Sequence, residues 1–275
     1  MTDKTIASRP TWLTAIIVIT VYFLLDKLYV GDMSRAVATA VAGDAPTWLK
    51  YMIRRLLHYP GPYLLVPAVV TILIVGRKNL VKVWGFDKWP WRGVAFAFFC
   101  CLPLPLVYFF AYPISDLSAL PIRYLNSAIM PGVAEEVLFR CFLFGLLFRV
   151  AKWGFLPAAM IGAVIFGSGH LYQGHAILDS LGVFGITAFA ALWWAWLYVE
   201  WDYNPWVPIG FHVFMNGWFV IFTVSDSALL PIAGEIARAS VVLISIALTF
   251  VMKQRQGGRA IVGRLWLKRV APRLD

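Results

Sequence analysis

Long apolar stretches, separated by short polar segments, run along almost the whole chain. A helix needs about 20 apolar residues to cross ~30 Å of hydrocarbon, and stretches of about this length recur from one end to the other. The pattern predicts an all-α polytopic membrane protein with about eight transmembrane helices. We place these spans near residues 11–30, 60–76, 92–112, 126–149, 154–174, 178–199, 205–224 and 232–252.

Two further segments are amphipathic and fit the membrane surface better than its interior. In residues 46–58 the apolar positions recur at helical spacing, and Lys50 and Arg54 lie on the opposite face. Residues 259–270 mix apolar and basic side chains in the same manner. Helices of this kind lie in the headgroup layer, so we expect both segments to be interfacial anchors.

The composition supports a lipid environment. Apolar residues make up 61% of the chain and charged residues 14%, whereas soluble domains have roughly 45–50% and about 25%. Residues 11–30 are long enough to span and no small-residue cleavage site follows them, which predicts a retained first span in the cell (inner) membrane. The three cysteines lie in apolar runs without CxxC spacing, so we expect neither a disulfide nor a cysteine metal site.

The net charge of +10 indicates a partner of negative charge. The basic residues lie beside the spans and in the tail, which favours anionic lipids and argues against nucleic acid. With the N-terminus inside, sixteen of the 24 Lys and Arg residues fall on the inner side and six on the outer side. The excess predicts that both termini are cytoplasmic.

Charged residues inside spans are the candidates for chemistry, because each costs ~2.5–3.5 kcal/mol or more unless it is paired. Glu136 and Arg140 are four residues apart, the favourable order for a helical ion pair. Glu135 points about 100° away and has no local partner, so it can act as a general base or acid. The alternative is a purely structural network of Glu135, Glu136 and Arg140.

A second cluster is Phe166 and His170, which are one turn apart and share a helix face. Gly162, Gly167 and Gly169 leave room for a neighbouring backbone. A single histidine in a membrane can equally well form a hydrogen bond between helices.

A third cluster is His212 and Asn216, again four residues apart. Two hydrogen-bond donors aimed at one point can stabilise an oxyanion, although they can also join helices. The three clusters together supply what hydrolysis of an amide requires: a base for the water, donors for the oxyanion and a proton for the leaving nitrogen. Another pair of charges, Glu235 and Arg238, is expected to be an ion pair within the last span.

The three motifs resemble those of the CPBP family, the type II CAAX prenyl endopeptidases and their bacterial relatives. The family pattern EExxxR, FxxxH and HxxxN is present from Glu135 to Arg140, from Phe166 to His170 and from His212 to Asn216. The resemblance covers about residues 126–224, which we interpret as a catalytic core between N-terminal spans (1–125) and a last span with a basic tail (225–275).

The resemblance also implies roles for these residues. Glu135 would activate the water that His170 helps to hold, and His212 with Asn216 would stabilise the oxyanion, although the division between the two histidines is open. Glu136, Arg140 and Phe166 would be supporting residues. The family resemblance favours a glutamate-dependent endopeptidase without a cofactor. A zinc site of Glu135, His170 and His212 is the alternative, but the HExxH motif is absent.

The predicted spans leave one difficulty, because His212 would lie about 10 Å deeper than Glu135. A tilted seventh span or a break near Gly167 would close the gap. The expected substrate is a membrane-anchored or hydrophobic peptide. The competing hypotheses are a scaffold or immunity protein that binds a peptide in the same pocket without cleaving it, and a small transporter.

Overall fold

The computed structural model describes residues 11–28, 60–224 and 228–258, with a few isolated positions between 29 and 59. Most of the expected surface helix at 46–58, and all of the one at 259–270, lie outside these residues. The described part consists of helices joined by turns and loops, with a single antiparallel bridge between Ile114 and Phe222. The α-helices are α1 (Thr11–Leu28), α4 (Val66–Val75), α5 (Leu80–Trp84), α6 (Pro90–Cys100), α7 (Pro103–Ala111), α8 (Leu120–Tyr124), α9 (Met130–Glu136), α10 (Phe155–Gly169), α11 (Ile177–Glu200), α12 (Trp206–Ile221) and α13 (Ile232–Arg255).

Fewer helices than expected are long and apolar enough to cross a membrane alone. Three of the described helices meet this condition: Phe155–Gln173, Ile177–Glu200 and Ile232–Arg255. The number rises to five if two bent pairs are each one span, Gly61–Val75 with Arg77–Trp84 (115°) and Pro90–Cys100 with Pro103–Ala111 (41°). The all-α membrane fold is confirmed, and the count of eight spans is not.

The difference between the expected and the observed number of spans has a physical cause. The apolar parts of the expected first and seventh spans are the shorter helices Trp12–Leu24 and Trp206–Ile221, below the ~20 residues that a span needs. The expected fourth span contains charged side chains. It begins earlier than predicted, because α8, α9 and the π-helical turns Leu125–Ile129, Val137–Phe144 and Leu146–Val150 form one helical segment over residues 120–150.

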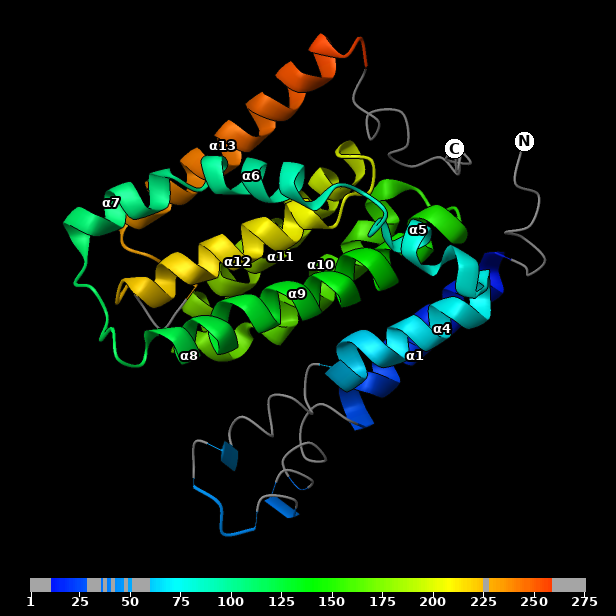
Figure 1. Ribbon diagram of the computed structural model, residues 1–275, viewed down its shortest axis with the longest axis horizontal. Helices are drawn as coiled ribbons and strands as arrows, with labels where there is room; N and C mark the ends of the chain where they lie inside the picture. The colour runs from blue at the N-terminus through cyan, green and yellow to red at the C-terminus, as the bar shows by residue number, and fades with distance from the viewer. Residues whose placement is uncertain are drawn as a thin grey trace.

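This helical segment lies at the centre of the bundle. Every residue from Glu136 to Arg149 is buried, and α1, α4, α10, α11 and α12 lie around it (Figure 1). The charged side chains of Glu136, Arg140 and Arg149 are therefore surrounded by protein.

Small residues allow α12 to approach its two neighbours closely. A Cβ atom on Gly132 of α9 would lie 3.2 Å from the backbone nitrogen of Val213, and one on Gly93 of α6 would lie 2.8 Å from that of Val207. Because both positions are glycine, α12 can pack closely between α6 and α9. This packing brings His212 next to Glu135 and Glu136 of α9.

Of the three glycines of α10 that were expected to allow close approach of a neighbouring helix, only one does so. Gly167 does approach α11, because a Cβ atom there would lie 2.9 Å from the Phe184 ring. The expectation was wrong for Gly162 and Gly169, where an added Cβ would meet nothing within 4 Å.

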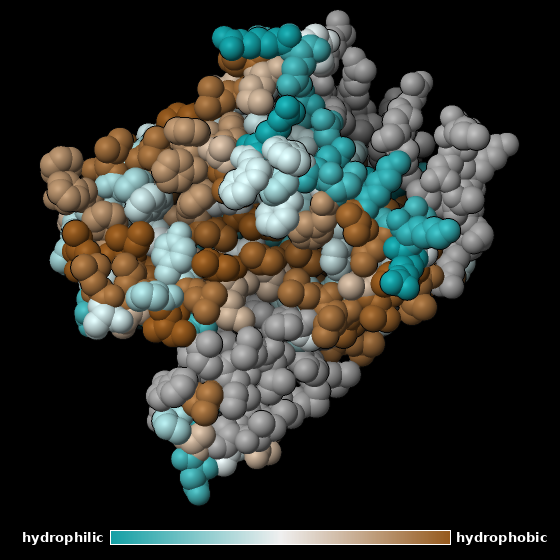
Figure 2. Space-filling view, viewed as in Figure 1, coloured by the Kyte–Doolittle hydropathy of each residue, from teal (hydrophilic) through white to brown (hydrophobic). Residues whose placement is uncertain are grey.

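Polar residues gather at one end of the bundle. Figure 2 shows hydrophilic residues around the end of α13 and near α5, with hydrophobic surface over much of the remainder of this face. Buried Arg149 fastens this end, since its guanidinium donates to the carbonyls of Lys82 and Val83 and lies 4.0 Å from the centre of the Tyr203 ring.

Candidate active site

Glu136 is the centre of the buried polar cluster. Its Oε2 lies 2.9 Å from Arg140 Nε, which confirms the expected ion pair, and its Oε1 lies 2.7 Å from Nδ1 of His212. All three side chains are almost completely buried. A carboxylate can only accept, so His212 Nδ1 carries the hydrogen and donates it to Glu136. The imidazole is thereby fixed with Nε2 turned the other way.

Glu135 lies on the other side of the His212 ring. Its Oε2 is 3.9 Å from Nε2 of His212, and its side chain is 17% exposed. Glu135 also interacts electrostatically with His170. The depth difference anticipated from the span boundaries does not separate the groups, because Glu135 lies near the middle of the continuous helical segment 120–150.

His170 stands immediately after the end of α10. Its Nδ1 is 2.7 Å from the backbone oxygen of Phe166, and the Phe166 ring is 4.5 Å from the imidazole, measured between centroids. Because a carbonyl oxygen only accepts, Nδ1 again carries the hydrogen. Nε2 of His170 is the ring nitrogen that this contact leaves free for another partner.

Aromatic rings enclose the charged groups. The Arg140 guanidinium carbon lies 5.3 Å from the ring centroid of Phe166 and 5.1 Å from that of Trp194, distances typical of cation–π contacts. Trp194 also stacks on His212, with 4.8 Å between centroids and 29° between planes. Phe166 and Trp194 thus hold the ion pair and the imidazole in one arrangement.

Trp194 was not predicted from the sequence to be part of this site. Tryptophan in a membrane protein usually lies at the headgroup level, and the pair Trp193–Trp194 is near the end of the span predicted at 178–199. The sequence did contain one signal for this position. The two tryptophans lie about two helical turns before Glu200, the acidic end of the span. That depth is too great for a residue of the headgroup layer.

A cavity of about 510 Å³ opens beside the cluster. Its lining includes His170, His212 and Asn216, and Asn216 Nδ2 donates to the backbone oxygen of Ser127 at 3.3 Å. This size is typical of a ligand site. Most of the lining is apolar and comes from α10, α11, α12 and α13. The residues that line it do not include Glu135.

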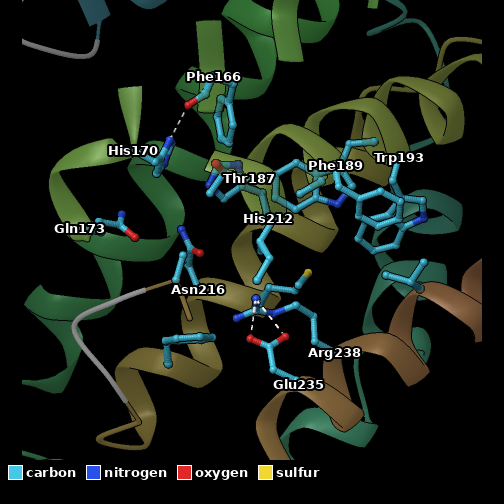
Figure 3. Close-up of a pocket in the computed structure, with 18 of the residues that line it drawn as sticks. Phe166, His170, Gln173, Thr187, Phe189, Trp193, His212, Asn216, Glu235 and Arg238 are labelled. Carbon is cyan, nitrogen blue, oxygen red and sulfur yellow. Dashed lines mark hydrogen bonds and ion pairs between the residues drawn. The ribbon is translucent and has the colours of Figure 1, made fainter. Parts of the chain in front are cut away.

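The second predicted ion pair also borders this cavity. Arg238 Nη1 lies 3.4 Å from Oε2 of Glu235, which confirms the pairing. Figure 3 shows the pair on α13, across the cavity from Phe166 of α10 and from His170, which directly follows α10. His212 and Asn216 of α12 lie between them.

Metal binding by these residues was the alternative to a reaction without a cofactor. Among the described residues, no group of three His, Cys, Asp or Glu side chains is placed to hold an ion. That Glu135, His170 and His212 act without a metal stays a prediction.

The chain is thus an all-helical membrane protein with a carboxylate–arginine–imidazole site enclosed in its bundle. Residues 117–218 match the family described as Type II CAAX prenyl endopeptidase Rce1-like. This segment holds the EExxxR, FxxxH and HxxxN motifs, so the match confirms their resemblance to the CPBP family of membrane proteases.

A curated relative matches part of the chain. The chain is 34% identical over 105 residues to a Bacillus subtilis (strain 168) protein named "Putative membrane peptidase YdiL". The alignment spans 38% of this chain and 38% of the relative. No solved structure gives a significant match.

Proposed function

We propose that the protein is an intramembrane endopeptidase that hydrolyses a peptide bond of a hydrophobic or membrane-anchored substrate with a water activated by Glu135. The main support is the distance of 3.9 Å between Glu135 Oε2 and His212 Nε2, with the other face of the imidazole held by Glu136. The membrane peptidase family of the segment favours the same reaction class.

The gap between Glu135 and His212 suits one water molecule. A water with hydrogen bonds of about 2.8 Å to both atoms would subtend an angle of about 90° across the 3.9 Å separation, slightly compressed from tetrahedral. Glu135 would take a proton from this water as it attacks the carbonyl carbon, and would later deliver that proton to the leaving nitrogen.

The hydrogen positions suggest how the two histidines divide the work. His212 lies between Glu136 and Glu135. When both of its ring nitrogens carry a hydrogen, Nε2–H could donate first to the water and then to the oxyanion that forms beside it. Asn216 uses one N–H on Ser127 and keeps a second for the same purpose. Nε2 of His170, when it carries no hydrogen, can accept a hydrogen of the water and orient it.

The apolar cavity would receive the substrate. Its lining by α10, α11, α12 and α13 favours an extended hydrophobic segment, with the scissile carbonyl near His212 and Asn216. We further propose that the protein resides in the cell membrane among anionic lipids with both termini in the cytoplasm, because sixteen of the 24 Lys and Arg residues fall on the expected inner side.

The test uses purified protein in liposomes with a panel of membrane-anchored reporter peptides, and mass spectrometry to identify the products. Glu135→Gln should lower turnover by about 10²–10⁴-fold and leave the melting temperature near that of the parent protein. The matched control is Asp116→Asn, which changes an exposed carboxylate and should preserve activity. A chelator should have no effect. Cleavage retained by Glu135→Gln would end the assignment, and loss of cleavage with chelator would require a metal.

One observation favours a second candidate. Because Glu135 is not part of the cavity lining, a scaffold or immunity protein could bind a peptide there without cutting it. Saturable binding of a reporter peptide that is never cleaved, with equal affinity in Glu135→Gln, would support this alternative.

A further inference from the structure

A second cavity, of about 180 Å³, lies at the polar end of the bundle, far along the helices from the candidate active site. It is formed where α6 begins and where α11 and α13 end. Its lining brings together three cations and several hydrogen-bonding side chains: Lys88, Trp89, Arg92, Glu200, Trp201, Asp202, Asn204, Thr249, Met252, Lys253 and Gln256.

The charges of this cavity leave an excess of one positive charge. Lys253 Nζ lies 3.6 Å from Oε2 of Glu200, whose side chain is fully buried, so these two charges offset each other. Lys88 and Arg92 form no ion pair with any residue in the described ranges. Against them stands the exposed carboxylate of Asp202. A group with a single negative charge would complete the balance.

Neutral donors point to the same kind of ligand. Trp89 occupies the N-cap position of α6 and provides no side-chain hydrogen bond to the cap, so the first N–H groups of this helix of 11 residues lack that partner. Such an N-terminus favours anions. Thr249 Oγ1 accepts from Trp201 Nε1 at 3.1 Å, so its own hydrogen can be donated.

The surroundings indicate where the anion comes from. Trp89 and Trp91 are 66% and 68% exposed, as expected for indole rings in the headgroup layer. Arg77 and Lys78 lie exposed just beyond the end of α4. The cavity therefore lies at the level of lipid phosphates.

We propose that this cavity binds the phosphate of an anionic phospholipid, held by Lys88, Arg92 and the start of α6. The lipid would join α6 to the ends of α11 and α13. This inference does not depend on the proposed peptidase activity, because it concerns other residues and predicts binding of a lipid.

The test measures bound phosphatidylglycerol by native mass spectrometry of the detergent-solubilised full chain, titrated against phosphatidylcholine. The double variant Lys88→Gln/Arg92→Gln removes both unpaired cations of the cavity. The control Arg77→Gln/Lys78→Gln removes the same charge from the same end of the bundle, outside the cavity. At about 1 kcal/mol for each basic residue, the cavity variant should lose about 30-fold in affinity and the control less than about 3-fold.

The outcomes are separable. Two results together would support the site. The preference for phosphatidylglycerol should persist at 0.5 M salt, where the Debye length is below ~8 Å, and it should be lost only in the cavity variant. Equal losses in the two variants would show general attraction to a basic surface and overturn it. Displacement of the lipid by millimolar inorganic phosphate would assign the cavity to free phosphate and also overturn the lipid proposal.

Discussion

His212 Nδ1 lies 2.7 Å from Oε1 of Glu136, a residue 76 positions earlier in the chain. Through this contact one carboxylate serves two purposes: it offsets the buried charge of Arg140 and sets the orientation of the imidazole. The pair that sequence analysis described as a local helical ion pair is therefore also the connection between α9 and α12.

The double role of Glu136 makes it more important for stability than Glu135. Glu136→Gln should lower the free energy of unfolding by about 3–5 kcal/mol, because Arg140 stays buried without a counter-charge. Thermal unfolding in detergent checks this. Glu235→Gln is the control, since that pair is partly exposed and should contribute at most about 1 kcal/mol.

A second variant separates charge from shape. Glu136→Gln/Arg140→Met removes both charges and should recover part of the lost stability, because a buried pair replaced by apolar groups is often neutral. Parent-like melting of the single variant Glu136→Gln would contradict the proposed importance of the buried charge.

Trp194 should act as a positioning residue. Trp194→Leu removes the ring that stacks on His212 and contacts Arg140, an interaction of about 0.5–2 kcal/mol. We expect kcat to fall by up to about 10-fold with KM little changed, and Trp194→Phe to restore most of it, because the Trp194 indole N–H has no hydrogen-bond partner among the described residues. Trp196→Leu, on another face of α11 against Phe250, is the control. An equal loss in that variant would point to general damage.

Asn216 tests the oxyanion hole. Asn216→Ala should reduce kcat by about 10²–10³-fold with unchanged KM, because the donor acts on charge that develops only in the transition state. Asn79→Ala is a suitable comparison, since it also removes a donor to a backbone carbonyl, that of Val75, away from the site. A rise in KM at constant kcat would instead place Asn216 in substrate binding.

Gly132 tests whether the approach of α12 to α9 sets the site geometry. In Gly132→Ala the new Cβ would lie 2.5 Å from Cγ2 of Val213, so we expect a loss of about 1–3 kcal/mol in stability together with lower activity. Val213→Ala should partly suppress the effect. Gly162→Ala, where the space is open, should be neutral or stabilising in the same melting assay. Unchanged activity in Gly132→Ala would show that the distance is set elsewhere.

Much of the site was predictable because its residues follow local spacing. Two features depend only on the helical period: the ion pair of Glu136 with Arg140, and the placement of Phe166 and His170 on one helix face. The structure contains both features. The contact between His212 and Glu136 depends on how α12 packs, which no local pattern encodes. The role of His170 in holding the proposed water stays a prediction.

The fold was predictable at the level of class, and its details were not. Hydropathy identified apolar helices, but length alone could not show that α12 would be short or that the chain would turn sharply between Val75 and Arg77. Nor could it show that the charged segment would begin at Leu120, because α8 packs against α12, a tertiary contact that hydropathy does not encode.

The central segment therefore has a consequence for biogenesis. A helix that carries Glu136, Arg140 and Arg149 would pay ~2.5–3.5 kcal/mol or more for each charge if it entered lipid alone. All residues from Glu136 to Arg149 are buried within the protein. This helix must therefore pack against other helices before it can leave the translocation channel. Synthesis of the helices that follow it, α10 through α12, must be complete before the segment is fully enclosed, so formation of the candidate active site is coupled to late steps of membrane integration.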